Sequence, residues 1–116
     1  MDIKSDEYTI YYDLESKTVF FQGILWLNGI EEYQQIIDLL NQAVEETSAF
    51  TLDLRQLELL NSSGISMLSM FAMQMRQKPN VQLTLLGASR IPWQKRSLRN
   101  LQRLMPSLLL KLILDA

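Results

Sequence analysis

The stretch FTLDLRQLELLNSSGISMLSMF, residues 50–71, changes its hydrophobic period in the middle. Phe50, Leu52 and Leu54 alternate with other side chains, which predicts a strand. After the turn, apolar side chains recur every three or four residues and predict one face of a helix: Ile65, Leu68, Ala72 and Met75. The sequence Asn-Ser-Ser-Gly at 61–64 therefore marks the point where a strand ends and a helix begins.

Strand and helix patterns alternate along the rest of the chain. The predicted strands lie at residues 8–12, 18–25, 50–54, 81–86 and 108–114, and the predicted helices at about 30–46, 64–77 and 94–104. Asn28 and Glu31 resemble a capping box at the first helix. Strands separated by helices are usually parallel neighbours, whereas the first two strands read as an antiparallel hairpin. The sequence predicts a single α/β domain, residues 1–116, with a mixed sheet of about five strands.

Composition excludes several classes of chemistry. The 116 residues include no cysteine and no histidine, so thiolate nucleophiles, zinc–thiolate sites and Ser-His-Asp triads are excluded. The segment 1–13 is polar and acidic and does not resemble a signal peptide. No apolar run reaches the ~18 residues that a membrane span needs. We therefore expect a cytoplasmic protein without metal or cofactor. Nucleic acid is not expected as a ligand, because the whole chain is acidic and no aromatic residues are interleaved with its basic stripe.

Charge is distributed unevenly although the net charge is only −2. Residues 1–58 contain twelve acidic side chains, and residues 90–116 contain most of the bases, namely Arg90, Lys95, Arg96, Arg99, Arg103 and Lys111. Lys95, Arg99 and Arg103 recur every four residues and form one cationic stripe on the third predicted helix. Such polarity is typical of a partner-binding face, and a merely solvated face is the alternative.

The quoted stretch resembles the signature of the STAS domain, as found in bacterial anti-sigma-factor antagonists. The family pattern is a strand ending in Asp-Leu, a few residues, then Asp-Ser-Ser/Thr-Gly and an apolar helix. The resemblance covers about residues 8–104, and the segment IPWQKRSLRNLQRLMP is similar to uncharacterised cyanobacterial STAS-like regulators. It implies a STAS-like α/β fold with helices largely on one face of the sheet.

The resemblance also implies a function and a site. Members of the family bind a partner serine kinase, which is often the anti-sigma factor, and are switched by phosphorylation that a phosphatase reverses. The resemblance therefore implies a partner-switching module without catalytic activity of its own. The phosphorylated position corresponds to Ser62, with Ser63 as the less favoured alternative, and Asn61, Ser63 and Gly64 shape the turn. Two acidic residues of the family pattern are replaced, by Asn61 directly before the serine and by Trp26 after the early strand.

Other interpretations of these residues remain open. Either serine could serve only as the N-cap of the following helix. The protein could also bind its partner without phosphorylation, or sense a nucleotide or another small ligand in the same cleft. Five further side chains are candidate partner contacts, namely Met67, Met70, Arg90, Trp93 and Lys95. The alternative for the methionines is burial in the core, because large exposed apolar patches are uncommon on soluble monomers.

Overall fold

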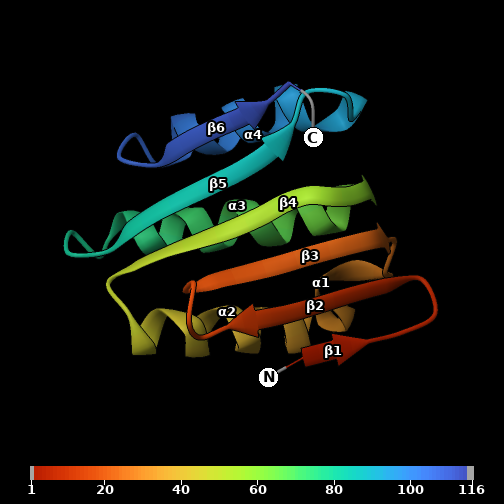
Figure 1. Ribbon diagram of the computed structural model, residues 1–116, viewed down its shortest axis with the longest axis horizontal. Helices are drawn as coiled ribbons and strands as arrows, with labels where there is room; N and C mark the ends of the chain where they lie inside the picture. The colour runs from red at the N-terminus through yellow and green to blue at the C-terminus, as the bar shows by residue number, and fades with distance from the viewer. Residues whose placement is uncertain (1, 115–116) are drawn as a thin grey trace.

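The computed structural model describes residues 2–114 and folds them into one six-stranded sheet with four helices (Figure 1). The strands are β1 (Asp2–Lys4), β2 (Tyr8–Asp13), β3 (Thr18–Leu25), β4 (Ala49–Leu60), β5 (Gln82–Ala88) and β6 (Leu109–Ile113). The helices are α1 (Gly29–Glu32), α2 (Gln34–Glu46), α3 (Ser62–Arg76) and α4 (Pro92–Leu104). Among these described residues, no helix is both long and apolar enough to cross a bilayer.

The strands lie in the sheet in the same order as in the chain, with β1 and β6 at the two edges. β1, β2 and β3 are antiparallel neighbours, whereas β3, β4, β5 and β6 run parallel. The predicted hairpin and mixed sheet are confirmed. The sheet has one strand more than about five. The additional strand β1 was not predicted because it spans only three residues, fewer than the roughly four over which alternation indicates a strand.

The helices form a layer on one face of the sheet, as predicted. In Figure 1, α2, α3 and α4 all lie behind the strands. The core fills the space between the two layers, and in β4 it contains Phe50, Leu52 and Leu54. Among residues 2–114, no helix lies over the opposite face of the sheet (Figure 1). Because the parallel strands end at one edge, the turns that follow β4 and β5 lie at that edge.

The first predicted helix is interrupted. The backbone leaves helical geometry at Tyr33, which has φ −87° and ψ 0°, so α1 and α2 are separate helices. The predicted capping box at Asn28 is wrong, because the Asn28 side chain makes no capping hydrogen bond. The backbone N–H of Asn28 instead donates to a carboxylate oxygen of Glu32, 3.2 Å away, and not to Glu31.

β4 is much longer than the predicted strand at 50–54. It continues to Leu60 because its second half pairs with β3 through Ile24 and Leu25, after two irregularities in the register. One irregularity lies at Gly23, whose φ of +98° favours glycine. A Cβ added there would lie 2.2 Å from the Glu7 carbonyl oxygen, so a side chain has no room. The long strand carries the Asn-Ser-Ser-Gly turn beyond the end of β5.

Candidate functional site at the turn between β4 and α3

Asn61 is the N-cap of α3 and joins three segments of the chain. Its side-chain oxygen accepts hydrogen bonds from the Gly64 N–H (3.0 Å) and from the Tyr33 hydroxyl (2.6 Å). Its amide nitrogen donates to the Leu27 carbonyl oxygen, 2.7 Å away. The side chain therefore uses both its acceptor and its donor. A carboxylate at this position would have no proton for the Leu27 carbonyl.

Tyr33 supports this network from the break between α1 and α2. Its side chain is completely buried, and its hydroxyl also accepts a hydrogen bond from the Leu27 N–H, 3.4 Å away. Burial raises the pKa of the Tyr33 hydroxyl above its usual value. The same packing requires a glycine at position 64, because a Cβ there would lie 2.7 Å from the Tyr33 oxygen and 2.2 Å from Leu60 Cδ1.

The two serines take no part in the capping network. Ser62 is the first residue of α3 and is exposed, and Ser63 is half-buried. Because Asn61 is the cap, neither serine is needed for that role. Within residues 2–114, neither hydroxyl makes a hydrogen bond. The N–H groups of the first turn of a helix also lack intrahelical acceptors, and the positive end of the helix dipole lies here.

An exposed stripe leads along α3 away from Ser62. Its members are separated by four, four and three residues, and are Ser62, Ser66, Met70 and Met73. Met70 is 47 % exposed and Met73 is 52 % exposed. The prediction of Met67 as a partner contact is wrong, because Met67 is 1 % exposed and faces the core together with Phe71. Three residues of the predicted stripe, Leu68, Ala72 and Met75, are buried, whereas Ile65 is only half-buried. The buried face of α3 is wider than predicted because it also includes Met67 and Phe71.

The side chains of Arg90 and Trp93 bind residues of β4 that come shortly before the Asn-Ser-Ser-Gly turn. The Arg90 guanidinium forms an ion pair with Glu58 at 3.2 Å, and the Trp93 indole N–H donates to the Leu57 carbonyl oxygen at 3.2 Å. Leu57 precedes Asn61 by four residues, or about 13 Å of extended strand. Trp93 is half-buried and packs against the core. These contacts place both side chains beside the second half of β4 and some distance from Ser62.

Gln94 is a buried polar residue that the sequence does not reveal as structural. Its side-chain oxygen accepts from the Ala88 N–H at 2.8 Å, and its nitrogen donates to the carbonyl oxygens of Leu54 (2.6 Å) and Leu57 (3.1 Å). The paired register of β4 and β5 ends at Asp53 and Leu86. Gln94 therefore bridges the two strands where their own backbone pairing has stopped.

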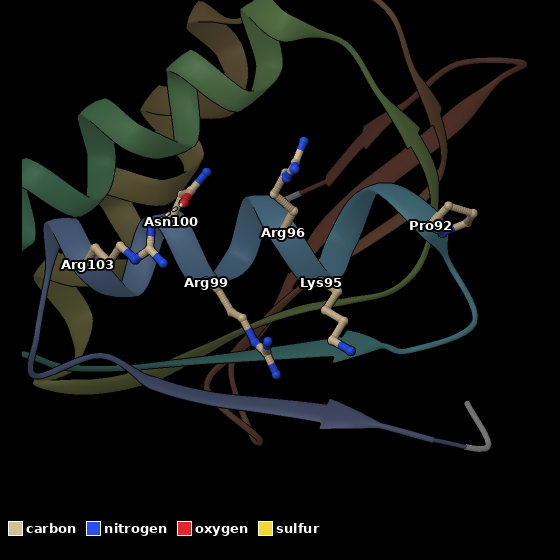
Figure 2. A pocket seen from close by; sticks show the side chains of 6 residues that line it. All are labelled: Pro92, Lys95, Arg96, Arg99, Asn100 and Arg103. Atoms are coloured by element: carbon tan, nitrogen blue, oxygen red, sulfur yellow. Dashed lines mark hydrogen bonds between the residues drawn. The ribbon is translucent and has the colours of Figure 1, made fainter.

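Lys95 lies farther along α4 in a cationic depression. The depression has a volume of about 550 Å³ and is lined by Pro92, Lys95, Arg96, Arg99, Asn100 and Arg103 (Figure 2). Lys95 and Arg99 extend on the side of β5 and β6, whereas Arg96 and Asn100 extend on the side of α3 (Figure 2). Lys95 thus lies on the flank of α4 that faces β5 and β6, and it stays a candidate partner contact.

Trp26 is an exposed aromatic residue close to the serine turn. It is 62 % exposed, and its neighbours Leu25 and Leu27 both accept hydrogen bonds from Asn61. In the sequence, Trp26 stands out only as the replacement of a family acid. An exposed tryptophan is a typical energetic centre of a protein interface. The sequence does contain one signal for the exposure of Trp26. Side chains alternate along β3, and Trp26 directly follows Leu25, which lies on the apolar side of the strand.

The sheet order, the helical layer on one face and the capped serine turn after a central parallel strand define a STAS-like fold.

The sequence matches no protein-family model and no curated protein. The fold is similar to that of SiaC of Pseudomonas aeruginosa, with a TM-score of 0.66, 17% identity and coverage of 100% of this chain and 97% of SiaC. It is similarly close to a chain in the crystal structure of the diguanylate cyclase SiaD in complex with its activator SiaC, with a TM-score of 0.67, 16% identity and coverage of 97% and 99%. The resemblance to STAS-like proteins is confirmed at the level of the fold.

Proposed function

We propose that this protein is a non-catalytic module that binds a protein partner and is switched by phosphorylation of Ser62. The observation that carries the proposal is the free, exposed Ser62 hydroxyl at one end of the stripe that contains Met70 and Met73. Flexible methionines suit adaptable protein interfaces. Trp26, on the other side of Asn61, extends the proposed contact surface.

Phosphorylation would change this surface without disturbing the core. A phosphoserine adds about 1.5 to 2 negative charges, and free N–H groups at the start of α3 are favourable neighbours for them. Asn61 keeps the helix capped in either state, because its bonds do not involve Ser62. The added charge would lie on the same exposed stripe as Met70 and would weaken the docking of a partner that covers this stripe.

The partner is proposed by analogy of fold. SiaC has the same fold and is an activator found in complex with an enzyme, the diguanylate cyclase SiaD. For the present chain we propose a signalling enzyme of the serine-kinase or anti-sigma type as the partner, with a phosphatase that restores the free serine. The carboxylate of Asp53 supports a non-catalytic role, since both its oxygens are bound by the Arg55 guanidinium at 3.0 and 2.7 Å.

Incubation with ATP and the serine kinase of the same gene neighbourhood tests the switch. We expect one added phosphate by intact mass, located at Ser62 by peptide mapping, and loss of the label in Ser62→Ala. Ser62→Asp should weaken the partner complex at least tenfold by calorimetry. Ser48→Asp, at an exposed serine just before β4, is the matched control and should leave affinity unchanged.

Two outcomes would contradict the proposal. The first is a kinase that labels no residue within 61–64. The second is a partner complex of equal affinity for wild type, Ser62→Ala and Ser62→Asp, which would identify a phosphorylation-independent binding module. A rise in melting temperature with a nucleotide alone would instead indicate a ligand sensor.

A further inference from the structure

β6 is an edge strand with an open side. Its only sheet neighbour among the described strands is β5. The Ile113 carbonyl accepts from the Ser89 N–H at 2.9 Å, so the backbone groups of Ile113 face the β5 side. Alternate residues of a parallel strand point their N–H and C=O groups to opposite sides. The backbone groups of Leu110 and Leu112 therefore point away from the sheet, as a template for another strand.

The side chains of β6 divide between two environments. Leu110 and Leu112 are half-buried and pack against the core on the helical side. Leu109, Lys111 and Ile113 are exposed and alternate with them, so they lie on the face without helices. The side chains of an additional strand beside β6 would alternate between the same two environments. One set would point toward α4, and the other would lie beside Leu109 and Ile113 on the face without helices.

A row of cations on α4 flanks this open edge. Gln102 donates to the Leu108 carbonyl oxygen at 3.2 Å, which places its flank of α4 next to the start of β6. Lys95 lies two helical turns earlier on the same flank, and Arg99 lies close to it. Figure 2 shows both side chains extending on the side of β5 and β6.

These cations lack acidic partners within residues 2–114. The two ion pairs of the described chain join Arg55 with Asp53 and Arg90 with Glu58, and neither involves α4. α4 itself contains no aspartate or glutamate. An unbalanced row of cations along one edge attracts a ligand of opposite charge.

We propose that the edge formed by β6 and α4 binds an extended acidic segment of another protein by strand addition. The backbone of that segment pairs with Leu110 and Leu112. Its acidic side chains, at every second position, face Lys95 and Arg99, and its apolar side chains lie beside Leu109 on the open face. This surface is separate from the Ser62 turn and does not depend on the proposed switch.

Other occupants fit the edge less well. A second copy that docks through its own β6 would bring two cationic rows together, and like charges oppose that contact. A lipid surface would satisfy the cations but would leave the outward N–H and C=O groups of the strand without partners. Nucleic acid would likewise pair with Lys95 and Arg99 without using the backbone edge. An acidic strand satisfies both features.

A labelled peptide tests the proposal through fluorescence anisotropy. The probe is a seven-residue peptide in which valine and glutamate alternate, and we expect saturable binding to the wild-type protein. One control peptide has lysine in place of glutamate. A second keeps the side chains but is N-methylated at alternate residues, so that it cannot form the strand. Both should bind at least tenfold more weakly than the probe.

Charge reversal on the protein provides the second arm. Lys95→Glu combined with Arg99→Glu should weaken binding of the glutamate peptide at least tenfold. Arg76→Glu combined with Lys78→Glu, at exposed cations near the end of α3, is the matched control and should change affinity less than twofold. Ser62→Asp should have no effect on the peptide, so the edge proposal and the switch proposal fail separately.

Three results would overturn the proposal. They are absence of binding to the glutamate peptide, equal binding of the lysine or N-methylated peptide, and equal binding by the variant reversed at 95 and 99. Sedimentation of the protein alone adds a fourth. Concentration-dependent association that the reversal at 95 and 99 abolishes would mean that an acidic surface of a second copy, rather than another protein, occupies the edge.

Discussion

At position 61 the hydrogen-bonding pattern favours an amide over the carboxylate that the STAS pattern has there. The side chain must accept from Gly64 and Tyr33 and also donate to the Leu27 carbonyl. Asn61→Asp removes the donor and places a charged oxygen where the amide donated at 2.7 Å. The loss of this bond costs about 1–3 kcal/mol. The interaction of a negative charge with the helix N-terminus offsets about 0.3–1 kcal/mol of this loss in stability.

We therefore expect Asn61→Asp to lower the free energy of unfolding by about 1–2 kcal/mol at pH 7 in urea titrations. The deficit should shrink toward pH 4, where a protonated carboxyl can again donate. Asn28→Asp is the matched control, because Asn28 is an exposed N-cap without a side-chain capping bond, and it should stay within about 0.5 kcal/mol. Equal stability of the Asn61 variant and wild type would contradict this account of the turn.

At the scale of elements, Gln94 holds the beginning of α4 against β4 and β5. Gln94→Leu leaves the Leu54 carbonyl and the Ala88 N–H without their side-chain partner, whereas Leu57 retains Trp93. Each buried group left without a partner costs about 1–3 kcal/mol, so we expect a loss of about 2–4 kcal/mol in the free energy of unfolding. Gln102→Leu, a half-buried glutamine of the same helix with one backbone bond, should cost less than about 1 kcal/mol. Similar losses for both variants would show that Gln94 is not a special bridge.

The elements were largely predictable, because strand and helix periods are local signals. The hairpin, the parallel strands and the helix predicted at 94–104 follow from spacing, and all are where the sequence places them. The buried face of α3 was predicted only in part: Leu68, Ala72 and Met75 are buried as expected, but the burial of Met67 was not foreseen, since methionines occupy several faces of the helix. Hydrophobicity alone does not orient such a helix.

The site was predictable only in part, because its contacts join distant segments. The Tyr33 hydroxyl meets Asn61 across 28 residues, and Gln94 meets Leu54 across 40. No local pattern marks a tyrosine in an apolar stripe as a hydrogen-bond donor to a cap. The serine turn itself was visible, because an Asn-Ser-Ser-Gly sequence between two periods is a local signal.

At the scale of the whole molecule, the acidic half of the chain contains two tyrosines that resist ionisation. Burial raises the pKa of Tyr33, and burial together with the charges of Glu46 and Asp13 raises the pKa of Tyr12. The Tyr12 hydroxyl oxygen is also buried and has no hydrogen-bond partner among residues 2–114. Both tyrosines are therefore more readily ionised in the unfolded chain than in the folded protein.

This linkage sets the direction of the alkaline pH dependence. A group whose pKa is raised by folding contributes stability that is complete below the pKa of the unfolded chain, about 10 for tyrosine, and is lost as pH rises through the folded pKa. We expect the free energy of unfolding to be level near pH 8–9 and to fall above about pH 10. Urea titrations between pH 8 and 11 measure it.

Two phenylalanine substitutions separate the contributions of the tyrosines. Tyr33→Phe should cost about 1 kcal/mol at pH 8, because Asn61 loses a donor, and should flatten the alkaline decline. Tyr12→Phe removes a hydroxyl without a described partner, so its cost at pH 8 should be close to zero, and it should also flatten the decline. If the double variant declines above pH 10 as steeply as wild type, lysine deprotonation rather than tyrosine burial would govern the alkaline limit of this fold.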